Sequence, residues 1–243
     1  MTRAEQAFTL VEIALSLAVV AFALVAILGV LPTGLRVQKD NREETIVNAD
    51  GAYLLEALRS GQDRLDYLSN SVYLVTINFK NGTRRTIPND WPAGDPRRLS
   101  GHSLLGLLGT PKAVGPAGVS NVVAWIRGVS GPAIDRDPDA RDVAFRYQAI
   151  LETQAFLGHP PATTNLLGTN DLARVHQLQS SLYEIRLTMR WPLFRDNVTA
   201  PQNARVGTRR RTFRTVVAGS QFYYPTNLAN DERMVFYFQP SLY

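Results

Sequence analysis

The 243-residue sequence contains no cysteine, which excludes disulfide bonds, thiolate metal sites and cysteine nucleophiles. It has only three histidines, and they are scattered, so we expect no histidine-based metal site and no cofactor. Lysine is equally scarce, at Lys39, Lys80 and Lys112, and arginine therefore carries most of the formal charge of +5. A small surplus of positive charge, spread along the chain, indicates a solvated surface and specifies no partner.

One long run near the beginning of the chain lacks charge altogether. From Ile13 to Pro32 it reads IALSLAVVAFALVAILGVLP, in which Ser16 is the only polar side chain. About 20 apolar residues in a helix cross roughly 30 Å of hydrocarbon. A cleaved signal peptide has a shorter apolar core that ends at a small-residue site, whereas Pro-Thr-Gly-Leu-Arg follows this run. We therefore predict a membrane-spanning helix, over residues 8–35, that stays in the protein.

The residues before this run have the order of a processing site. A short polar leader, MTRAEQA (residues 1–7), ends in Ala7, and FTLVE follows, with Phe8 first and Glu12 last. This junction resembles that of type IV prepilins and type II secretion pseudopilins, although the family usually has glycine where this chain has Ala7. The resemblance implies that prepilin peptidase cuts between Ala7 and Phe8 and methylates the new amine of Phe8. Residues 29–60 are also similar to pilin-like proteins of the Verru_Chthon cassette type and, more loosely, to minor pseudopilins.

Glu12 is an acidic residue inside membrane sequence. Such a residue costs about 2–3 kcal/mol by insertion scales and normally has a partner. The nearest basic residue, Arg3, belongs to the leader. Cleavage creates a cation, and the Phe8 amine of a neighbouring subunit would pair with Glu12 in a low dielectric, where the attraction is strong. The alternative is a glutamate at the membrane edge that reaches back to the headgroups.

The charges on the two sides of the span conflict with this assignment. The leader offers Arg3 and the amine, whereas Arg36, Lys39 and Arg42 follow the span. Counting positive charges would place the second side in the cytoplasm. The family resemblance implies the reverse, because prepilin peptidase cuts on the cytoplasmic side. We therefore expect a single-pass bacterial inner-membrane protein with its head in the periplasm, and later a periplasmic or cell-surface filament.

The rest of the chain predicts an α+β fold, in which one long helix packs on an antiparallel β-sheet. Pro32 and Gly34 should kink or loosen the helix. An amphipathic continuation (residues 36–61) should resume near Asp40, with an apolar stripe of Ile46, Val47, Leu54, Leu55 and Leu58. The head (residues 62–243) should begin with a hairpin over residues 71–88, turning at Asn81-Gly82. We expect further strands at residues 119–127, 142–152, 182–193 and 209–218, and long loops at residues 89–118 and 158–174.

Three segments invite a chemical interpretation. Gly101–Gly106 (GHSLLG) lacks the second glycine of a nucleophile elbow, which favours a short loop helix. Asp135, Asp137 and Asp139 have the alternate spacing of a calcium loop, but Ala140 and Arg146 stand where glycine and glutamate are needed, so we favour a solvated loop.

The third segment is basic. Strand alternation sends Arg209 and Arg211 to one face and Arg210 and Arg214 to the other. We favour a charged strand that protects a sheet edge over a surface for nucleic acid.

Together these features predict a structural or assembly subunit, typical of minor pilins, of a type IV pilus or a type II secretion-like filament. Its expected partners are other pilin or pseudopilin subunits, prepilin peptidase, the inner membrane and the assembly platform, and nucleic acid is not favoured. We expect no enzymatic activity. The alternatives are a filament-tip module that binds DNA or a secreted substrate, and a membrane-anchored periplasmic enzyme. The sequence does not separate a pilus subunit from a pseudopilin, or a major subunit from a minor one.

Overall fold

The computed structural model describes residues 9–61, 66–89, 91–92, 95–112, 118–130, 145–156, 173–175, 177, 180–194, 204–228 and 231–239. The chain divides into two compact units, Met1–Thr45 and Ile46–Tyr243. Helix α1 (Leu10–Ser60) contributes to both of them.

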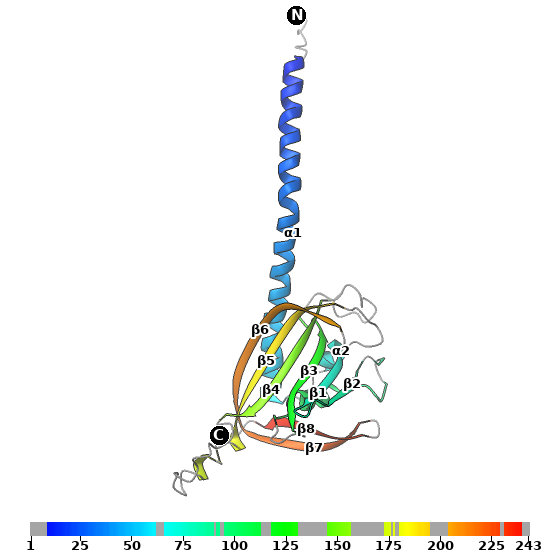
Figure 1. Ribbon diagram of the computed structural model, residues 1–243, viewed down its shortest axis with the longest axis vertical. Coiled ribbons are helices and arrows are strands. Elements are labelled where there is room, and N and C mark those ends of the chain that lie inside the picture. The colour runs from blue at the N-terminus through cyan, green and yellow to red at the C-terminus, as the bar shows by residue number, and fades with distance from the viewer. Residues whose placement is uncertain are drawn as a thin grey trace, which may run out of the picture. The chain divides into compact units, whose positions relative to one another are not determined.

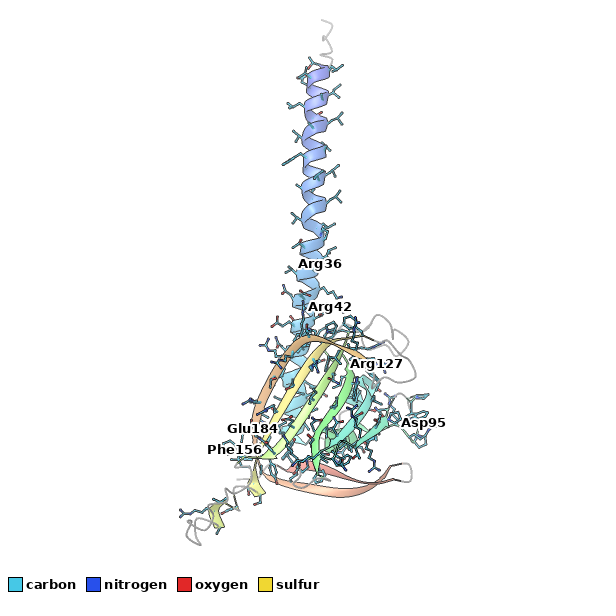
Figure 2. All side chains as sticks on the ribbon, viewed as in Figure 1. Arg36, Arg42, Asp95, Arg127, Phe156 and Glu184 are labelled. Carbon is cyan, nitrogen blue, oxygen red and sulfur yellow. The ribbon has the colours of Figure 1, made fainter. Side chains whose placement is uncertain are left out.

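The described part of the first unit consists of Thr9 and the first part of α1. Its large apolar side chains are all exposed, from Leu10 at 83% through Phe22 at 78% to Val37 at 52%. The helix is long and apolar enough to cross a membrane. Charged side chains reappear on α1 at Arg36, and Arg42 follows six residues later (Figure 2). The exposed surface of α1 thus changes from apolar to charged within this unit.

The helix does not stop and restart between the two units, so the prediction that it resumes near Asp40 is wrong. It continues unbroken through Pro32 and Gly34. Proline removes a single backbone hydrogen bond, and glycine costs about 1 kcal/mol relative to alanine, so an otherwise strong helical segment retains its conformation on both sides. A local bend at these two positions stays a prediction.

The second unit is built on a six-stranded antiparallel sheet in the order β2-β1-β3-β4-β5-β6, with a separate β7-β8 pair (Figure 1). The bounds are β1 Val72–Phe79, β2 Arg84–Pro88, β3 Val119–Arg127, β4 Arg146–Ala155, β5 Leu182–Phe194, β6 Arg205–Ala218, β7 Ser220–Leu228 and β8 Asp231–Gln239. The unit also contains two short helices, α2 (Asp66–Ser71) and α3 (Gly101–Leu108). The α+β class is therefore confirmed.

The first hairpin forms where it was predicted, but its turn is longer than two residues. The Gly82 N–H donates to the Phe79 carbonyl at 3.1 Å, and the Phe79 N–H donates to the Thr83 carbonyl at 3.0 Å. Gly82 has φ +84°, a conformation that favours glycine. This pattern is a type I turn on Lys80-Asn81 followed by a glycine bulge, one of the common hairpin connections.

One face of the sheet packs against the end of α1. The predicted stripe is confirmed, because Ile46, Val47, Leu54 and Leu58 are buried and Leu55 is partly buried. This core also contains the inward side chains of β1, β3, β4 and β5, and the apolar side of α3. α1 ends at Ser60, where Gly61 adopts φ +60° and donates its N–H to Ala57, as is typical of a helix C-terminus.

The strand predictions hold best for buried segments. β3 has the predicted bounds, and β5 exceeds its prediction by one residue. β6 begins four residues earlier than predicted, at Arg205, and β4 continues to Ala155. Residues 142–144 lie outside the described residues. The predicted loop at residues 89–118 contains α3, whose N-cap is Ser100, and residues 101–106 are thus a helix, as expected. β7 and β8 were not predicted.

A buried acidic residue joins α1 to the sheet. Asp50 is fully buried and accepts three hydrogen bonds, from the N–H groups of Val129 (2.8 Å) and Ser130 (2.7 Å) and from the Tyr147 hydroxyl (2.8 Å). Burial, followed by the adjacent Asp50 charge, raises the pKa of Tyr147 well above its ordinary value, so the phenol stays a donor. Asp50 therefore fixes the helix to a loop and to β4 at one point.

Replacing Asp50 should be costly. Asp50→Ala removes the acceptor of the buried Tyr147 hydroxyl and of two partly buried N–H groups, and a hydrogen bond to a charged group contributes about 1.5–3 kcal/mol. We expect a loss of at least about 3 kcal/mol, or roughly 6–12 °C in Tm for a chain of this size. Tyr147→Phe, which removes one bond and leaves the carboxyl two donors, should cost less than half as much. Thermal unfolding of the two variants beside the wild type measures the difference, and equal losses would contradict this role for Asp50.

Candidate functional site

The N-terminal end of α1 carries the first candidate site. The Thr9 N–H and hydroxyl both donate to Oε2 of Glu12, at 2.8 and 2.9 Å. In return, the Glu12 N–H donates to the Thr9 hydroxyl at 3.3 Å. This reciprocal arrangement is a capping box, which satisfies backbone donors at the start of a helix. Ala7 and Phe8, the predicted cleavage and methylation site, lie outside the described residues.

The capping box changes the interpretation of Glu12. The sequence predicted an acidic residue in need of a partner from another subunit, and the fold provides a partner on the same chain. Both donors from Thr9 reach the same oxygen, Oε2. Within the part of the chain that is described, Oε1 accepts no hydrogen bond. Glu12 can therefore cap its own helix and still offer one carboxylate oxygen to a cation.

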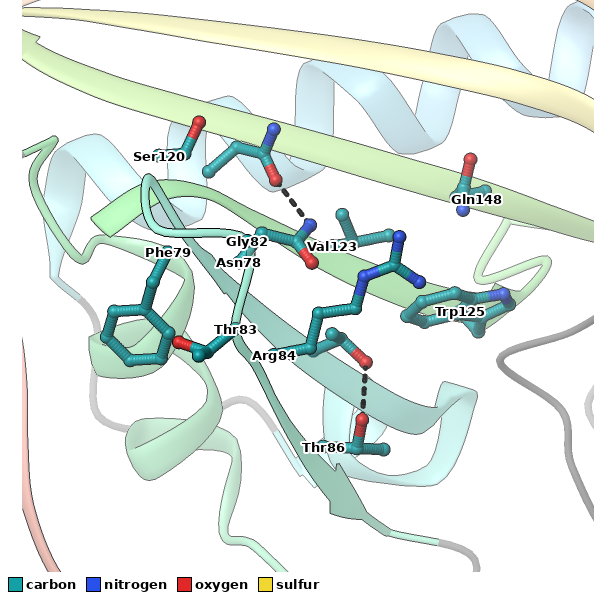
Figure 3. Close-up of a pocket in the computed structure, with 12 residues that line it drawn as sticks. Asn78, Phe79, Gly82, Thr83, Arg84, Thr86, Ser120, Val123, Trp125 and Gln148 are labelled. Carbon is teal, nitrogen blue, oxygen red and sulfur yellow. Dashed lines mark hydrogen bonds between the residues drawn. The ribbon is translucent and has the colours of Figure 1, made fainter. Parts of the chain in front are cut away.

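The second candidate feature is a shallow groove on the face of the sheet opposite the core (Figure 3). It has a volume of about 360 Å³ and lies between the β1-β2 hairpin, β3 and Gln148 of β4. Arg84 is the only charged residue among the described residues that line it. The polar groups at its floor bond to one another, Asn78 to Asn121 at 2.6 Å and Thr76 to Thr86 at 3.2 Å. This mutual pairing leaves few free donors for a ligand.

The basic segment lies on β6, the edge strand of the sheet as described. Side chains alternate as predicted, since Phe213 packs against the core and Arg210 and Arg214 are exposed on the opposite face. The register adds two arginines that sequence reasoning missed: Arg190 and Arg186 of β5 stand directly opposite Arg210 and Arg214. Their signal was the polar half of the alternation in LYEIRLTMRW, which places Arg186 and Arg190 on the outer face.

Metal binding has no support in the described residues, where no group of three or more histidine or acidic side chains could hold an ion. The weak calcium candidates Asp135, Asp137 and Asp139 lie outside them. Ser103, at the centre of the GHSLLG segment, accepts a hydrogen bond from Ser100 within the helix cap.

Comparison with known proteins gave no match to a family model, to a curated protein or to a solved structure.

Proposed function

We propose that this chain is an assembly subunit of a bacterial filament of the type IV pilus or type II secretion class, with no catalytic role of its own. Before assembly it is anchored in the inner membrane by α1, with the β-rich head in the periplasm. Prepilin peptidase removes residues 1–7 and methylates the amine of Phe8. The mature subunit then enters a filament in which the apolar helices of several subunits pack together.

The observation that carries this proposal is the order of features at the start of α1. A leader that ends in Ala7 precedes Phe8, the capping box of Thr9 and Glu12 follows, and an apolar helix surface begins at once. Every large apolar side chain from Leu10 to Val37 is exposed. In water that surface is unfavourable, at about 25 cal/mol per Å², so lipid or neighbouring helices must cover it.

The capping box supports a defined role for Glu12. Oε2 holds the helix start, and Oε1 points to no donor among the described residues. In a filament, the amine of a neighbouring subunit's Phe8 would contact Oε1 away from water, where opposite charges attract strongly. The uncompensated carboxylate of a lone subunit would thus favour incorporation beside a processed neighbour, because an unpaired charge in an apolar environment is costly.

Intact mass spectrometry of the protein extracted from its native membrane tests the proposal. The mature chain should begin at Phe8 and should be heavier than the bare sequence by one methyl group. Deletion of the prepilin peptidase gene should restore residues 1–7 and remove the methyl group. A chain that keeps Met1 in the wild-type cell, or that is cut after the apolar run, would contradict it.

A further inference from the structure

β6 is suited to recruit another strand. It has 14 residues, more than any other strand, and in the described part of the chain β5 is its only neighbour in the sheet. Figure 1 shows it along the outer side of the sheet. An edge strand presents backbone N–H and C=O groups that can pair with one more strand. Long edge strands of natural proteins usually carry features that prevent pairing with another chain. The side chains of β6 therefore determine which kind of strand can pair with it.

Those side chains create two pairs of like charges on the outer face. Arg210 stands opposite Arg190 and Arg214 opposite Arg186, and between the pairs the Thr212 and Thr188 hydroxyls share a hydrogen bond of 3.1 Å. Like charges directly opposite one another destabilise a sheet. Arg186 forms an ion pair with Glu152 of β4 at 3.7 Å, which offsets part of this repulsion.

Within the described residues, the other three arginines of this group have no such partner. In the described residues no carboxylate pairs with Arg190, Arg210 or Arg214. As far as the chain is described, an unfavourable cationic arrangement therefore remains on the edge strand β6.

We propose that β6 binds an extended acidic strand of a partner protein by strand addition to this edge. A strand paired with β6 places its side chains about 5 Å from those of Arg210, Thr212 and Arg214. The matching sequence is an acidic residue, any residue, serine or threonine, any residue, and a second acidic residue. Backbone hydrogen bonds supply the affinity, and the arginines select the acidic pattern. This inference does not depend on whether the chain enters a filament.

The positions of the acidic residues on the same face favour an edge strand over a polyanion lying across the sheet. Glu152 of β4 stands directly opposite Arg186, and Glu184 lies two residues before Arg186 on β5, so a polyanion that crosses the sheet through Arg214 and Arg186 would come close to both. A strand added to β6 lies roughly 10 Å from β5 and roughly 14 Å from β4, given about 4.8 Å per strand. Because the Debye length is about 8 Å in physiological salt, both repulsions are largely screened there.

Two further observations argue against other binding partners for this edge. Nucleic-acid surfaces on sheets use exposed aromatic rings for base stacking, and Trp125 of β3, which lies in the same row of paired residues as Arg190 and Arg210, is only 4% exposed. A second copy of β6 would oppose arginine with arginine, so self-pairing through this edge is disfavoured. The arginines thus protect the edge against copies of the same chain and admit an acidic strand.

Binding of a labelled peptide containing Glu-Thr-Thr-Thr-Glu to the full chain in detergent tests the inference. Fluorescence anisotropy should show saturable binding that a peptide with lysine in place of both glutamates lacks. Arg210→Glu combined with Arg214→Glu should weaken binding at least tenfold. The matched control is Arg84→Glu, an exposed arginine on β2 at the opposite edge of the same face, which should leave binding within twofold of the wild type.

Hydrogen exchange and a competing ligand separate strand addition from simple charge attraction. The peptide should slow exchange of β6 amides that exchange rapidly in the free protein. No peptide binding, equal weakening by the β6 and Arg84 variants, or unchanged exchange on β6 would each overturn the inference. Tighter binding of a single-stranded oligonucleotide through Arg210 and Arg214 would overturn it in favour of a nucleic-acid surface.

Discussion

A chain that begins at Gly61 should show no cooperative thermal unfolding, whereas a chain that begins at Arg36 should unfold in one transition. The two differ by the part of α1 that completes the core. It buries Ile46, Val47, Leu54 and Leu58, each of which is at most 5% exposed. At about 1.5–3 kcal/mol for each buried side chain, these four contribute roughly 6–12 kcal/mol. That range is comparable to the whole stability of a typical domain, about 5–15 kcal/mol.

Circular dichroism and calorimetry of both chains measure the difference, and a third chain that begins at Asp40 serves as the control. Residues 36–39, which it lacks, are exposed, so its Tm should match that of the chain that begins at Arg36. The shorter chain also loses Asp50 and leaves the Tyr147 hydroxyl buried without its acceptor. Equal melting temperatures for the chains that begin at Arg36 and Gly61 would mean that this part of the helix does not pack on the sheet.

The features that local chemistry determines could be predicted from the sequence. The spacing of Ile46, Val47, Leu54 and Leu58 gave the buried face of α1, because helical periodicity does not depend on the rest of the fold. Gly82 marked the first turn, since few other residues adopt its positive φ. The prediction that the helix resumes only near Asp40 was wrong, because a proline also occurs inside long helices, where the neighbouring turns compensate.

The features that depend on long-range pairing could not be predicted. The cluster at Arg186, Arg190, Arg210 and Arg214 exists only in the register of β5 and β6, which are joined by residues 195–204 and carry a shift between Trp191 and Leu193. β7 and β8 were missed for a different reason. Pro225 and the charged run Asp231-Glu232-Arg233 are atypical of strands inside a sheet, but a two-stranded pair has only edges and tolerates them.

The buried role of Asp50 was not predicted, although the sequence contains a signal for it. Asp50 lies four residues after Ile46 and four before Leu54, on the same stripe that predicted the buried face. A polar residue on a buried stripe requires hydrogen-bond partners. Its partners could not be named, because Val129, Ser130 and Tyr147 are 79 to 97 residues away along the chain.

Glu12 gives the most direct test of the proposed assembly, because two substitutions separate its two roles. Glu12→Gln removes the charge but keeps a side-chain oxygen that can accept from Thr9, since glutamine also serves in a capping box. Glu12→Ala removes both the charge and the cap. Both variants should insert into the membrane at least as well as the wild type, because an acidic residue opposes insertion.

The deciding measurement is the amount of each variant in filaments sheared from cells, relative to the amount in membranes. If Glu12 pairs with a neighbour's Phe8 amine, both variants should enter filaments at least tenfold less than the wild type, because an unpaired amine in an apolar environment costs several kcal/mol. Thr9→Val, which weakens the cap and keeps the carboxylate, should reduce incorporation far less. Normal incorporation of Glu12→Gln, with loss only in Glu12→Ala, would mean that Glu12 is a helix cap and nothing more, and would contradict the charge-paired assembly proposed for this chain.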